Sequence, residues 1–512
     1  MLARLHSYAV LGMDAYPVEV ETDLSRGLPA FNIVGLPDAA VRESRERVRA
    51  GMVNSQYEFP LRRITVNLAP ADVRKEGPSF DLPIALSLLA ASGQLESESL
   101  EVYGAAGELS LDGSVRRING SLSIAEAARQ ARCRGVLLPA ANAEEAALIN
   151  NIEVIGVESL SQAVEFLKGE AAIAPARVDA LALLSALRSD RLDLADVKGQ
   201  EHARRALEVC AAGGHNLLMT GPPGSGKTML ARRLPSILPP LDIAEAIEVT
   251  RIYSVAGRLN SGRSLIASRP FRSPHHTISH IGLTGGGGTP KPGEVSLSHL
   301  GVLFLDELPE FSRQALETLR QPLEDGRVSI SRALLSVTYP ARFMLVAAMN
   351  PCPCGHLGDA RQPCICIPQR IASYRSRISG PLMDRIDVAV EVPGLTKKEI
   401  LSGRNRESSA AVAQRVASAR KKQSERLAGT NTFCNAQMSV GQTERSCHTS
   451  AAGARLLDSA IERLFLSARA HHRILKVSRT IADLEGVTGI EPQHIAEAIS
   501  YRSMDRRGWN GV

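Results

Sequence analysis

Aromatic residues and long apolar runs are both scarce in this sequence. Aromatic side chains make up 4% of the 512 residues, with a single tryptophan among them. No run approaches the ~20 consecutive apolar residues that a membrane-spanning helix needs. Residues 1–6 lack the apolar core and the cleavage site of a signal peptide. These absences predict a soluble, cytoplasmic protein that does not enter a membrane.

Cysteine content and net charge are also modest. Eight cysteines in a chain of this length do not make a disulfide scaffold, and four of them cluster.

The 60 Lys+Arg against 54 Asp+Glu leave a net charge of +6, which does not by itself indicate nucleic acid. Residues 396–430 hold nine basic and three acidic side chains, so this segment alone carries an excess of that size. It is either a solvated helix face or an electrostatic contact with phosphates.

A glycine-rich loop stands between an apolar run and a helix-like segment. Residues 221–228 read GPPGSGKT, follow the apolar run 216–220 and lead into 229–234, which is the order strand, loop, helix. Glycines let backbone N–H groups turn toward phosphate oxygens at a helix N-terminus. In such loops the lysine reaches the β- and γ-phosphates and the hydroxyl ligates Mg²⁺. The pattern predicts a site for ATP and Mg²⁺ made of Gly221, Pro222, Pro223, Gly224, Ser225, Gly226, Lys227 and Thr228.

A second motif predicts that the bound nucleotide is hydrolysed. Residues 301–305 form an apolar run that is followed by Asp306 and Glu307. A buried parallel strand has this pattern, and acidic residues at its carboxyl end lie where ligands bind. We expect Asp306 to hold Mg²⁺ together with Thr228, and Glu307 to polarise the attacking water. The alternative is a core strand that ends in a solvated acidic turn.

Hydrophobic patterns divide the chain into parts. Its length suggests about three domains of ~150 residues each. Residues 1–170 alternate strand-like and helix-like runs, which predicts an α/β domain, and residues 171–194 read as a linker. Residues 195–393 alternate strand and helix around the phosphate loop, as a doubly wound parallel sheet does. Helical periodicity dominates residues 394–512.

Two segments interrupt the nucleotide-type domain. Between residues 269 and 293, glycine and proline are too dense for a regular helix, which predicts an inserted loop. Residues 324–337 read as a β-hairpin ahead of the core strand 343–348. We expect Arg327 and Arg332 on or near the tip of this hairpin.

Four motifs together resemble those of the ComM (YifB) competence family, a group of AAA+ ATPases of the Mg-chelatase-like type. They are residues 271–279 (FRSPHHTIS), 291–299 (KPGEVSLSH), 301–307 (GVLFLDE) and 376–387 (SRISGPLMDRID). The resemblance covers nearly the whole chain. It implies an AAA+ core with a helical lid, in which both inserts face the pore of a homo-hexameric ring. It also implies a DNA helicase that drives branch migration when incoming single strands recombine into the chromosome during natural transformation.

The same resemblance implies roles for further residues by position. Asn350 matches a first sensor that holds the attacking water, and Arg385 matches an arginine finger that reaches the ATP of a neighbouring subunit. The alternatives are a strand cap for Asn350 and a surface ion pair for Arg385. Arg469 matches the second sensor, with Arg473 one turn later as the competing assignment. DNA phosphates would be contacted without regard to sequence by pore-loop residues Arg272, Lys291, Arg327 and Arg332.

The N-terminal part resembles a Lon-protease-like domain. Its residues 75–79, KEGPS, fall where that family keeps a nucleophilic serine, which is Ser79 here. The lysine that would complete a Ser–Lys dyad is missing from residues 118–123, which read INGSLS. A serine without a nearby base is a weak nucleophile. We therefore expect no peptidase activity, and a scaffold or DNA-binding role for this domain.

Four cysteines follow Asn350 in the order CxC, nine residues, CxC; they are Cys352, Cys354, Cys364 and Cys366. Four thiolates could close a tetrahedral zinc site in a loop that is otherwise too polar and proline-rich to fold. The one-residue spacing is tighter than usual. Reduced cysteines without metal are the alternative, because disulfides are not expected in the cytosol. His275 and His276 are adjacent and cannot share a helix face, so we expect no metal there.

Three functions compete. A hexameric DNA translocase would act on single-stranded and branched DNA, alongside recombination proteins. A Mg-chelatase motor subunit would share the ATPase core, but the fused Lon-like domain, the cysteine cluster and the ComM-like motifs argue against it. A protein-threading chaperone is disfavoured because its pore usually displays an aromatic motif that we do not find. Stimulation of ATP hydrolysis by single-stranded DNA separates the first function from the other two.

Overall fold

The chain folds into two compact units. The computed structural model describes residues 2–186, 192–259, 262–288, 290–331, 336–359, 362–395, 407–464 and 466–502. The first unit comprises Met1–Leu187, Ile243–Ala267 and Ser331–Tyr339, and the second comprises Arg188–Asp242, Ser268–Ile330 and Pro340–Val512. The domain limits expected from the sequence stay predictions.

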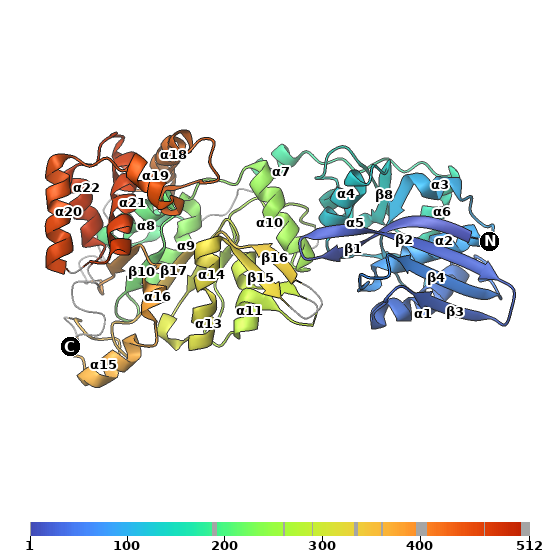
Figure 1. The fold of residues 1–512 in the computed structure, drawn as a ribbon, viewed down its shortest axis with the longest axis horizontal. Coiled ribbons are helices and arrows are strands. Elements are labelled where there is room, and N and C mark those ends of the chain that lie inside the picture. The colour runs from blue at the N-terminus through green and yellow to red at the C-terminus, as the bar shows by residue number, and fades with distance from the viewer. Residues whose placement is uncertain are drawn as a thin grey trace. The chain divides into compact units, whose positions relative to one another are not determined.

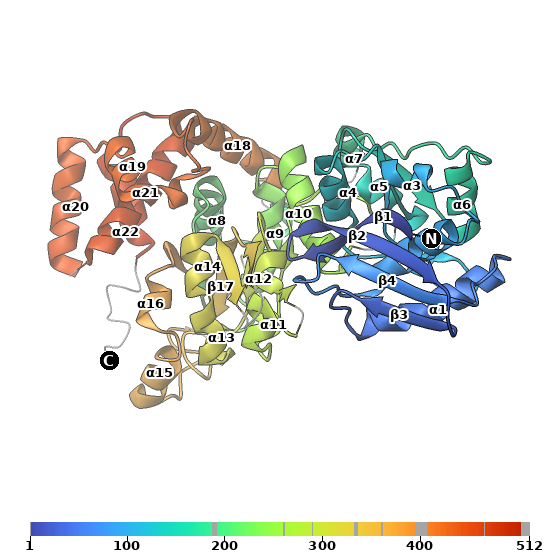
Figure 2. The same ribbon diagram turned by 45° about the vertical axis from the view of Figure 1, so that its right-hand side comes forward.

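A seven-stranded sheet forms the centre of the first unit. Its strand order is β3 (Ala30–Val34), β4 (Arg63–Ala69), β2 (Asp14–Ser25), β1 (Leu2–Leu11), β5 (Tyr103–Ala105), β8 (Gly135–Pro139) and β9 (Glu153–Val157). The pairs β1–β2 and β2–β4 are antiparallel, and the other neighbours are parallel. Figure 2 shows β1, β2, β4 and β3 as adjacent blue arrows. The unit is therefore a mixed α/β fold.

Seven helices of the first unit precede residue 187 in the described chain. They are α1 (Ala39–Asn54), α2 (Asp81–Ala91), α3 (Glu98–Val102), α4 (Ser121–Gln130), α5 (Ala140–Ala146), α6 (Leu160–Lys168) and α7 (Ala180–Ala186). Two minor strands, β6 (Glu108–Leu109) and β7 (Val115–Arg116), pair with each other. Helix α2 is buried along its whole length and packs on β1 and β2, as its almost continuous apolar sequence requires.

Helix α10 (Ile243–Val255) belongs to the first unit, although it lies inside the range that the sequence assigns to the nucleotide-type domain. The hydroxyl of Ser254 accepts a hydrogen bond from the backbone N–H of Gly120 at 3.0 Å and donates one to the carboxylate of Glu145. These buried polar contacts fix the helix beside α4 and α5. Hydrophobic periodicity does not reveal such contacts, because it reports only which face of a helix is apolar.

A parallel five-stranded sheet forms the centre of the second unit. Its order is β11 (Phe271–Arg272), β14 (Val302–Leu305), β17 (Met344–Met349), β10 (Leu217–Thr220) and β18 (Val388–Glu391). Every residue of β10, β14 and β17 is buried. Helix α8 (Glu201–Gly213) packs on β10, and α9 (Lys227–Ile237) packs on β14 and β17. The prediction of an α/β fold with a parallel sheet around the phosphate loop is confirmed.

The remaining elements of the second unit are short inserts and a C-terminal group of helices. The inserts contain α11 (His280–Thr284), β12 (Gly285–Gly286), β13 (Lys291–Pro292), α12 (Glu294–Leu297), α13 (Arg313–Thr318), α14 (Arg320–Asp325), β15 (Arg327–Ser331), α15 (Pro368–Arg375) and α16 (Gly380–Met383). Strand β16 (Ser336–Pro340) pairs with β15 but belongs, apart from its last residue, to the first unit. The C-terminal helices are α18 (Ser409–Arg426), α19 (Val440–Ser446), α20 (Ala451–Leu464), α21 (Ala468–Glu485) and α22 (Pro492–Ser500). Figure 1 shows α20, α21 and α22 grouped in red, in agreement with their mutual contacts.

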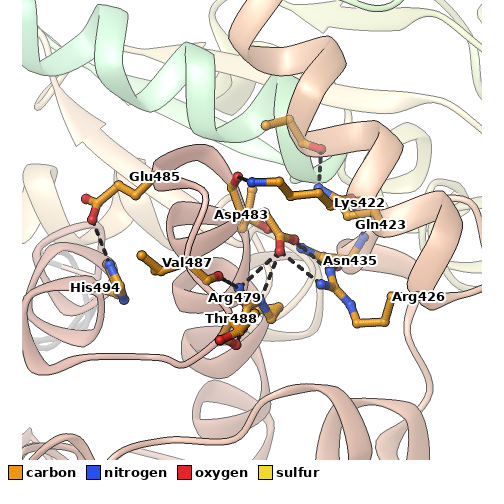
Figure 3. Close-up of polar contacts among 12 residues, drawn as sticks. Lys422, Gln423, Arg426, Asn435, Arg479, Asp483, Glu485, Val487, Thr488 and His494 are labelled. Carbon is orange, nitrogen blue, oxygen red and sulfur yellow. Dashed lines mark hydrogen bonds and ion pairs between the residues drawn. The ribbon is translucent and has the colours of Figure 1, made fainter.

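A buried polar cluster holds the C-terminal helices together (Figure 3). The Asp483 carboxylate, which is 2% exposed, accepts hydrogen bonds from both terminal nitrogens of Arg426 at 2.9 and 2.6 Å. It also accepts from Arg479 Nε at 3.1 Å and from Asn435 Nδ2 at 2.9 Å. The charge of this carboxylate is thus paired with guanidinium groups of the same chain. We call these four residues the Asp483 cluster.

None of the helices within the described ranges combines the length and the hydropathy that crossing a bilayer demands.

Candidate nucleotide-binding site

Three neighbouring strands bring the predicted site residues to one edge of the parallel sheet. Thr220 at the end of β10 lies opposite Met349 at the end of β17, and Leu305 at the end of β14 lies opposite Ala347. The phosphate loop, Asp306 and Asn350 directly follow these strand ends. They therefore meet at the carboxyl edge of the sheet, where α/β folds bind ligands.

The phosphate loop needs its glycines for two different reasons. Gly224 and Gly226 have φ angles of +71° and +97°, in the left-handed region that side chains disfavour. Gly221 lies so close to the backbone that a Cβ there would collide with the carbonyl oxygen of Val392. Helix α9 begins directly after Gly226, so its N-terminal N–H groups face the loop.

Lys227 is buried and is surrounded by neutral oxygen atoms. Its Nζ donates hydrogen bonds to the carbonyls of Gly221 at 2.7 Å and Pro222 at 3.0 Å, and to Asn350 Oδ1 at 3.3 Å. Burial lowers the pKa of Lys227, and the negative charges of Asp306 and Glu307 oppose that shift. A buried cation whose hydrogen bonds go to neutral oxygens is well suited to an anionic ligand such as phosphate.

Thr228 and Asp306 lie side by side. The Thr228 hydroxyl donates a hydrogen bond of 2.7 Å to Asp306 Oδ2, and the second carboxylate oxygen accepts from the backbone N–H of Glu307 at 3.0 Å. A hydroxyl and a carboxylate are the oxygen ligands that Mg²⁺ prefers. The donor set therefore fits a magnesium ion that also contacts phosphate.

His276 contacts Glu307, a contact that sequence reasoning missed. The Nδ1 of His276 lies 3.2 Å from Glu307 Oε2, and the Glu307 side chain is 56% exposed. Strand β11 runs parallel to β14, with Arg272 opposite Leu303, so residues that follow β11 reach the same sheet edge as Glu307. The short strand Phe271–Arg272 ahead of the histidines could have predicted this contact. The glycines and prolines around it made the strand hard to recognise in the sequence.

Arg385 is paired inside its own chain. Its guanidinium forms an ion pair with Glu324, and Nε donates to the carbonyl of Arg320 at 3.3 Å. These residues line a cavity of about 460 Å³ together with Glu317 and Thr284. These contacts explain how the Arg385 side chain, which is 9% exposed, can be buried. The assignment of Arg385 as an arginine finger stays a prediction.

The two candidate second sensors, both on α21, contact the segment that carries Arg385. Arg469 is 69% exposed, and its Nη1 lies 3.5 Å from Asp384 Oδ2. Arg473 is 16% exposed, lies 3.6 Å from Asp387 Oδ1 and donates to the carbonyl of Ile386 at 3.2 Å. Arg469 is thus the one more accessible to a ligand in solution, and the choice between them stays a prediction.

Comparison with known proteins gives matches along the whole chain. The family model for magnesium chelatase, subunit ChlI, matches residues 193–400. The models for subunit ChlI of Mg-chelatase and for the ChlI C-terminal region match residues 20–142 and 406–502. The proteins named YifB of Salmonella typhimurium and Escherichia coli are 45% and 44% identical to this chain. The matches cover 99% of this chain and 98% of each relative. Competence protein ComM of Haemophilus influenzae is 45% identical with the same coverage.

The chain belongs to the ComM/YifB family. Membership confirms the predicted AAA+ core of the Mg-chelatase-like type, and AAA+ proteins of this kind use ATP and Mg²⁺. A magnesium-chelatase 67 kDa subunit of Chlorobaculum parvum is 29% identical, but over only 30% of this chain and 23% of that protein. The relationship to ComM and YifB is therefore far more extensive than the relationship to that chelatase subunit.

Among the predicted pore-loop residues that the structure describes, Arg272 is the most constrained. Its guanidinium forms a bidentate ion pair with Glu294, at 2.6 and 2.7 Å. A DNA phosphate would have to compete with that carboxylate. Lys291 is exposed on β13, whose partner strand β12 is made of glycines.

Arg327 is exposed at the first residue of β15, so it lies at the base of the hairpin and not on or near its tip. The reason is local: Gly326 adopts a left-handed conformation with φ of +64°, ends α14 and starts the strand at the next residue. Arg332 lies outside the described residues.

The basic segment 396–430 is partly engaged in contacts within the protein. Arg415 pairs with Glu208 and Glu407, and Arg420 donates to the carbonyl of Ala211. These contacts favour an ordinary helix surface over a phosphate contact for the α18 residues involved. The predicted basic residues Lys397, Lys398, Arg404 and Arg406 lie outside the described residues.

The four clustered cysteines converge in space. Their Sγ atoms lie within 4.8 Å of one another, which is compatible with a bound zinc ion. Backbone N–H groups of His356 and Ile365 lower the pKa of Cys354 to about 6, whereas burial and hydrogen bonds with the neighbouring thiols raise the pKa values of Cys364 and Cys366.

In the first unit, Ser79 lies in a short 3₁₀ helix, Pro78–Phe80. The lysine just ahead of it, Lys75, is buried, and its ammonium donates to the carbonyl of Pro70. The absence of peptidase activity stays a prediction.

Proposed function

We propose that this chain is an ATP-dependent DNA translocase that works in the cytoplasm as a homo-hexamer. In this proposal it drives branch migration while incoming DNA recombines during natural transformation, alongside recombination proteins. The observation that carries the ATPase part of the proposal is the convergence of Lys227, the Thr228–Asp306 pair and Glu307 at the carboxyl edge of the parallel sheet. The 45% identity to competence protein ComM over 99% of the chain supports the DNA-directed part.

Each residue has a distinct task in the proposed hydrolysis. Backbone N–H groups of the loop and Lys227 bind the phosphates, while Thr228 and Asp306 hold Mg²⁺. The metal, when bound, neutralises charge on the transferred phosphoryl group. Glu307 orients the attacking water and accepts its proton, because its carboxylate is exposed at the same edge.

The proposed hexamer explains why Arg385 would be supplied from outside the site. An arginine given in trans stabilises the charge that develops on the phosphoryl group. Arg385 would then exchange Glu324 for the ATP of the neighbouring subunit. Hydrolysis would thus depend on assembly, and motion between neighbours would move DNA through the ring.

The deciding experiment measures ATP hydrolysis with and without single-stranded DNA, and unwinding of forked duplexes, at low salt. We expect DNA to stimulate hydrolysis and forks to be unwound, and Lys227→Ala to abolish both. The exposed Glu444 on α19 provides a control, because Glu444→Ala removes no group that is proposed to contact nucleotide or DNA and should behave as the wild type. A monomer that neither binds DNA nor responds to it would instead favour a chelatase motor or a protein-remodelling chaperone.

A further inference from the structure

The cysteine cluster has the dimensions of a tetrahedral metal site. The Sγ atom of Cys352 lies 3.4 Å from that of Cys354 and 3.6 Å from that of Cys364, and the latter two are 3.6 Å apart. Four sulfurs at ~2.3 Å from a zinc ion are about 3.8 Å apart at the corners of a regular tetrahedron. Cys366, the fourth, is within 4.8 Å of the others. All four are free thiols.

This cluster packs directly against the phosphate loop. Gly355, which follows Cys354, has a φ of +85°, and a Cβ at this position would lie 2.6 Å from Cδ of Pro223. Only glycine permits both the backbone conformation and the close approach. The loop that carries two of the cysteines therefore touches the loop that is proposed to bind phosphate.

A second connection runs through the strand that precedes the cluster. Asn350, which accepts from Lys227 Nζ at 3.3 Å, is separated from the buried Cys352 by one residue. The intervening Pro351 carbonyl accepts a hydrogen bond from Arg375 of α15 at 3.3 Å. In addition, the backbone N–H of Gly221 bonds the carbonyl of Met349 at 3.2 Å. Hydrogen bonds thus connect the segment just ahead of the cysteines both to Lys227 and to the first residue of the phosphate loop.

We propose that the four cysteines bind one zinc ion, and that this ion fixes Asn350 and the phosphate loop so that zinc and nucleotide bind cooperatively. The second part rests on the proposed nucleotide site at Lys227. The physical reason is that the segment between β17 and α15 is short of apolar side chains that could order it. Metal ligation would supply that order, as it does in small zinc-dependent folds. A loop already ordered costs less conformational entropy when nucleotide binds.

Linkage gives the proposal a quantitative test, because two ligands that favour one another must do so by the same factor. The full-length protein is purified without chelators, and its zinc content is measured by elemental analysis. Zinc affinity is then measured by competition with a chromogenic chelator, with and without a non-hydrolysable magnesium nucleotide. Nucleotide affinity is measured separately on zinc-loaded and zinc-stripped protein. The variant Cys354→Ser/Cys364→Ser removes the site, and Cys133→Ser, a half-buried thiol of the first unit, is the control.

We expect one zinc per chain in the wild type and the control, and none in the double variant. Nucleotide should raise zinc affinity by about 5-fold or more, and zinc should raise nucleotide affinity by the same factor. Far less than one zinc per chain would overturn the metal site. Full zinc occupancy with identical zinc affinity in the presence of bound nucleotide would overturn the cooperativity. Failure of zinc-loaded protein to bind nucleotide would overturn the proposed function, and the zinc content would keep that failure distinct from failure of the metal site.

Discussion

The second unit contains two largely buried groups of polar residues, and the two groups differ in how their charged side chains are paired. In the Asp483 cluster, one carboxylate is hydrogen-bonded by two guanidinium groups, so its negative charge is paired within the chain (Figure 3). At the phosphate loop, the hydrogen bonds of Lys227 go to two carbonyls and an amide, and Asp306 is bonded by a hydroxyl. The cation and the carboxylates of this second group do not form hydrogen bonds with each other.

The difference separates structural from ligand-binding charges. A matched cluster stabilises one arrangement of helices, and removing one member leaves an uncompensated buried charge. A lysine held by neutral oxygens keeps a charge that an anionic ligand can use, at little cost in existing ion pairs. We therefore expect variants of the first cluster to affect folding and variants of the second to affect chemistry.

Arg385 offers the severest challenge to this distinction, because it is paired within the chain and yet is proposed to act on ATP. Arg385→Ala should lower the ATPase rate of the assembled protein by about 10³-fold or more, the usual effect of losing an arginine finger. Its free energy of unfolding should fall by only ~1 kcal/mol, because the partner Glu324 is largely exposed.

The matched control for Arg385 is Glu324→Gln, which frees the guanidinium and should keep the ATPase rate. If the two variants lower stability alike and leave hydrolysis intact, Arg385 is structural, and the in-chain pair alone accounts for it.

Asp483→Ala tests the matched cluster. Without the carboxylate, the buried Arg479 and the half-buried Arg426 lose their ion-pair partner, so the free energy of unfolding should fall by ~3–5 kcal/mol. Chemical denaturation measures this loss. Asp458→Ala, at an exposed position on α20, should be nearly neutral. Equal stability of the two variants would contradict the structural role of the cluster.

Lys227→Ala is the counterpart at the phosphate loop. The ATPase rate should fall by about 10²–10³-fold, because a donor aimed at the transferred phosphoryl group is lost. The free energy of unfolding should change by less than ~1 kcal/mol, since no ion pair is broken. Steady-state hydrolysis and denaturation curves measure the two effects. A large loss of stability without a loss of hydrolysis would show that Lys227 has a structural role and contradict its role in binding ATP.

Asp387 provides a pH test of a matched charge. Burial raises its pKa, but the positive groups His215 and Arg473 nearby, together with a hydrogen bond of 2.9 Å from the Asn216 backbone N–H, outweigh burial and hold the pKa below its ordinary value. The unfolded value is about 3.9, so this contribution to stability is complete above about pH 4 and is lost as the pH falls through the lower folded pKa.

Denaturation from pH 6 to pH 2 measures that loss, which amounts to about 1.4 kcal/mol for each unit by which the folded pKa is lowered. Asp387→Asn cannot titrate and should flatten this acid limb. An unchanged acid limb would show that the carboxylate is not stabilised in the folded state.

His276→Ala should have the smallest effect. The pair with Glu307 is half exposed and worth ~1 kcal/mol or less, so kcat should fall by about 2–5-fold with ATP affinity unchanged. His275 is the natural control, because its ring bonds Thr277 instead. Pre-steady-state hydrolysis measures kcat and ATP affinity separately. An equal effect of both substitutions would indicate a general role of the insert rather than positioning of Glu307.

Much of the nucleotide site could be predicted because its residues are adjacent to strand ends in the sequence. The run 301–305 is apolar throughout, so Asp306 necessarily follows a buried strand. Arg327 lies at the base of its hairpin, contrary to the expectation that it lies on or near the tip, because Gly326 ends α14 and the strand starts at the next residue. The place of α10 in the first unit depends on Ser254 and Glu145, which carry no periodic signal.

The phosphate loop, the acidic strand end and membership of an AAA+ family follow from residue order alone, because they depend on short segments whose sequence dictates local geometry. Only the tertiary structure brought His276 to Glu307, Gly355 to Pro223 and four thiols into one cluster. Those contacts depend on the order of parallel strands and on loop conformations. Neither is encoded in the pattern of any one segment, because each arises from backbone packing between elements far apart in the chain.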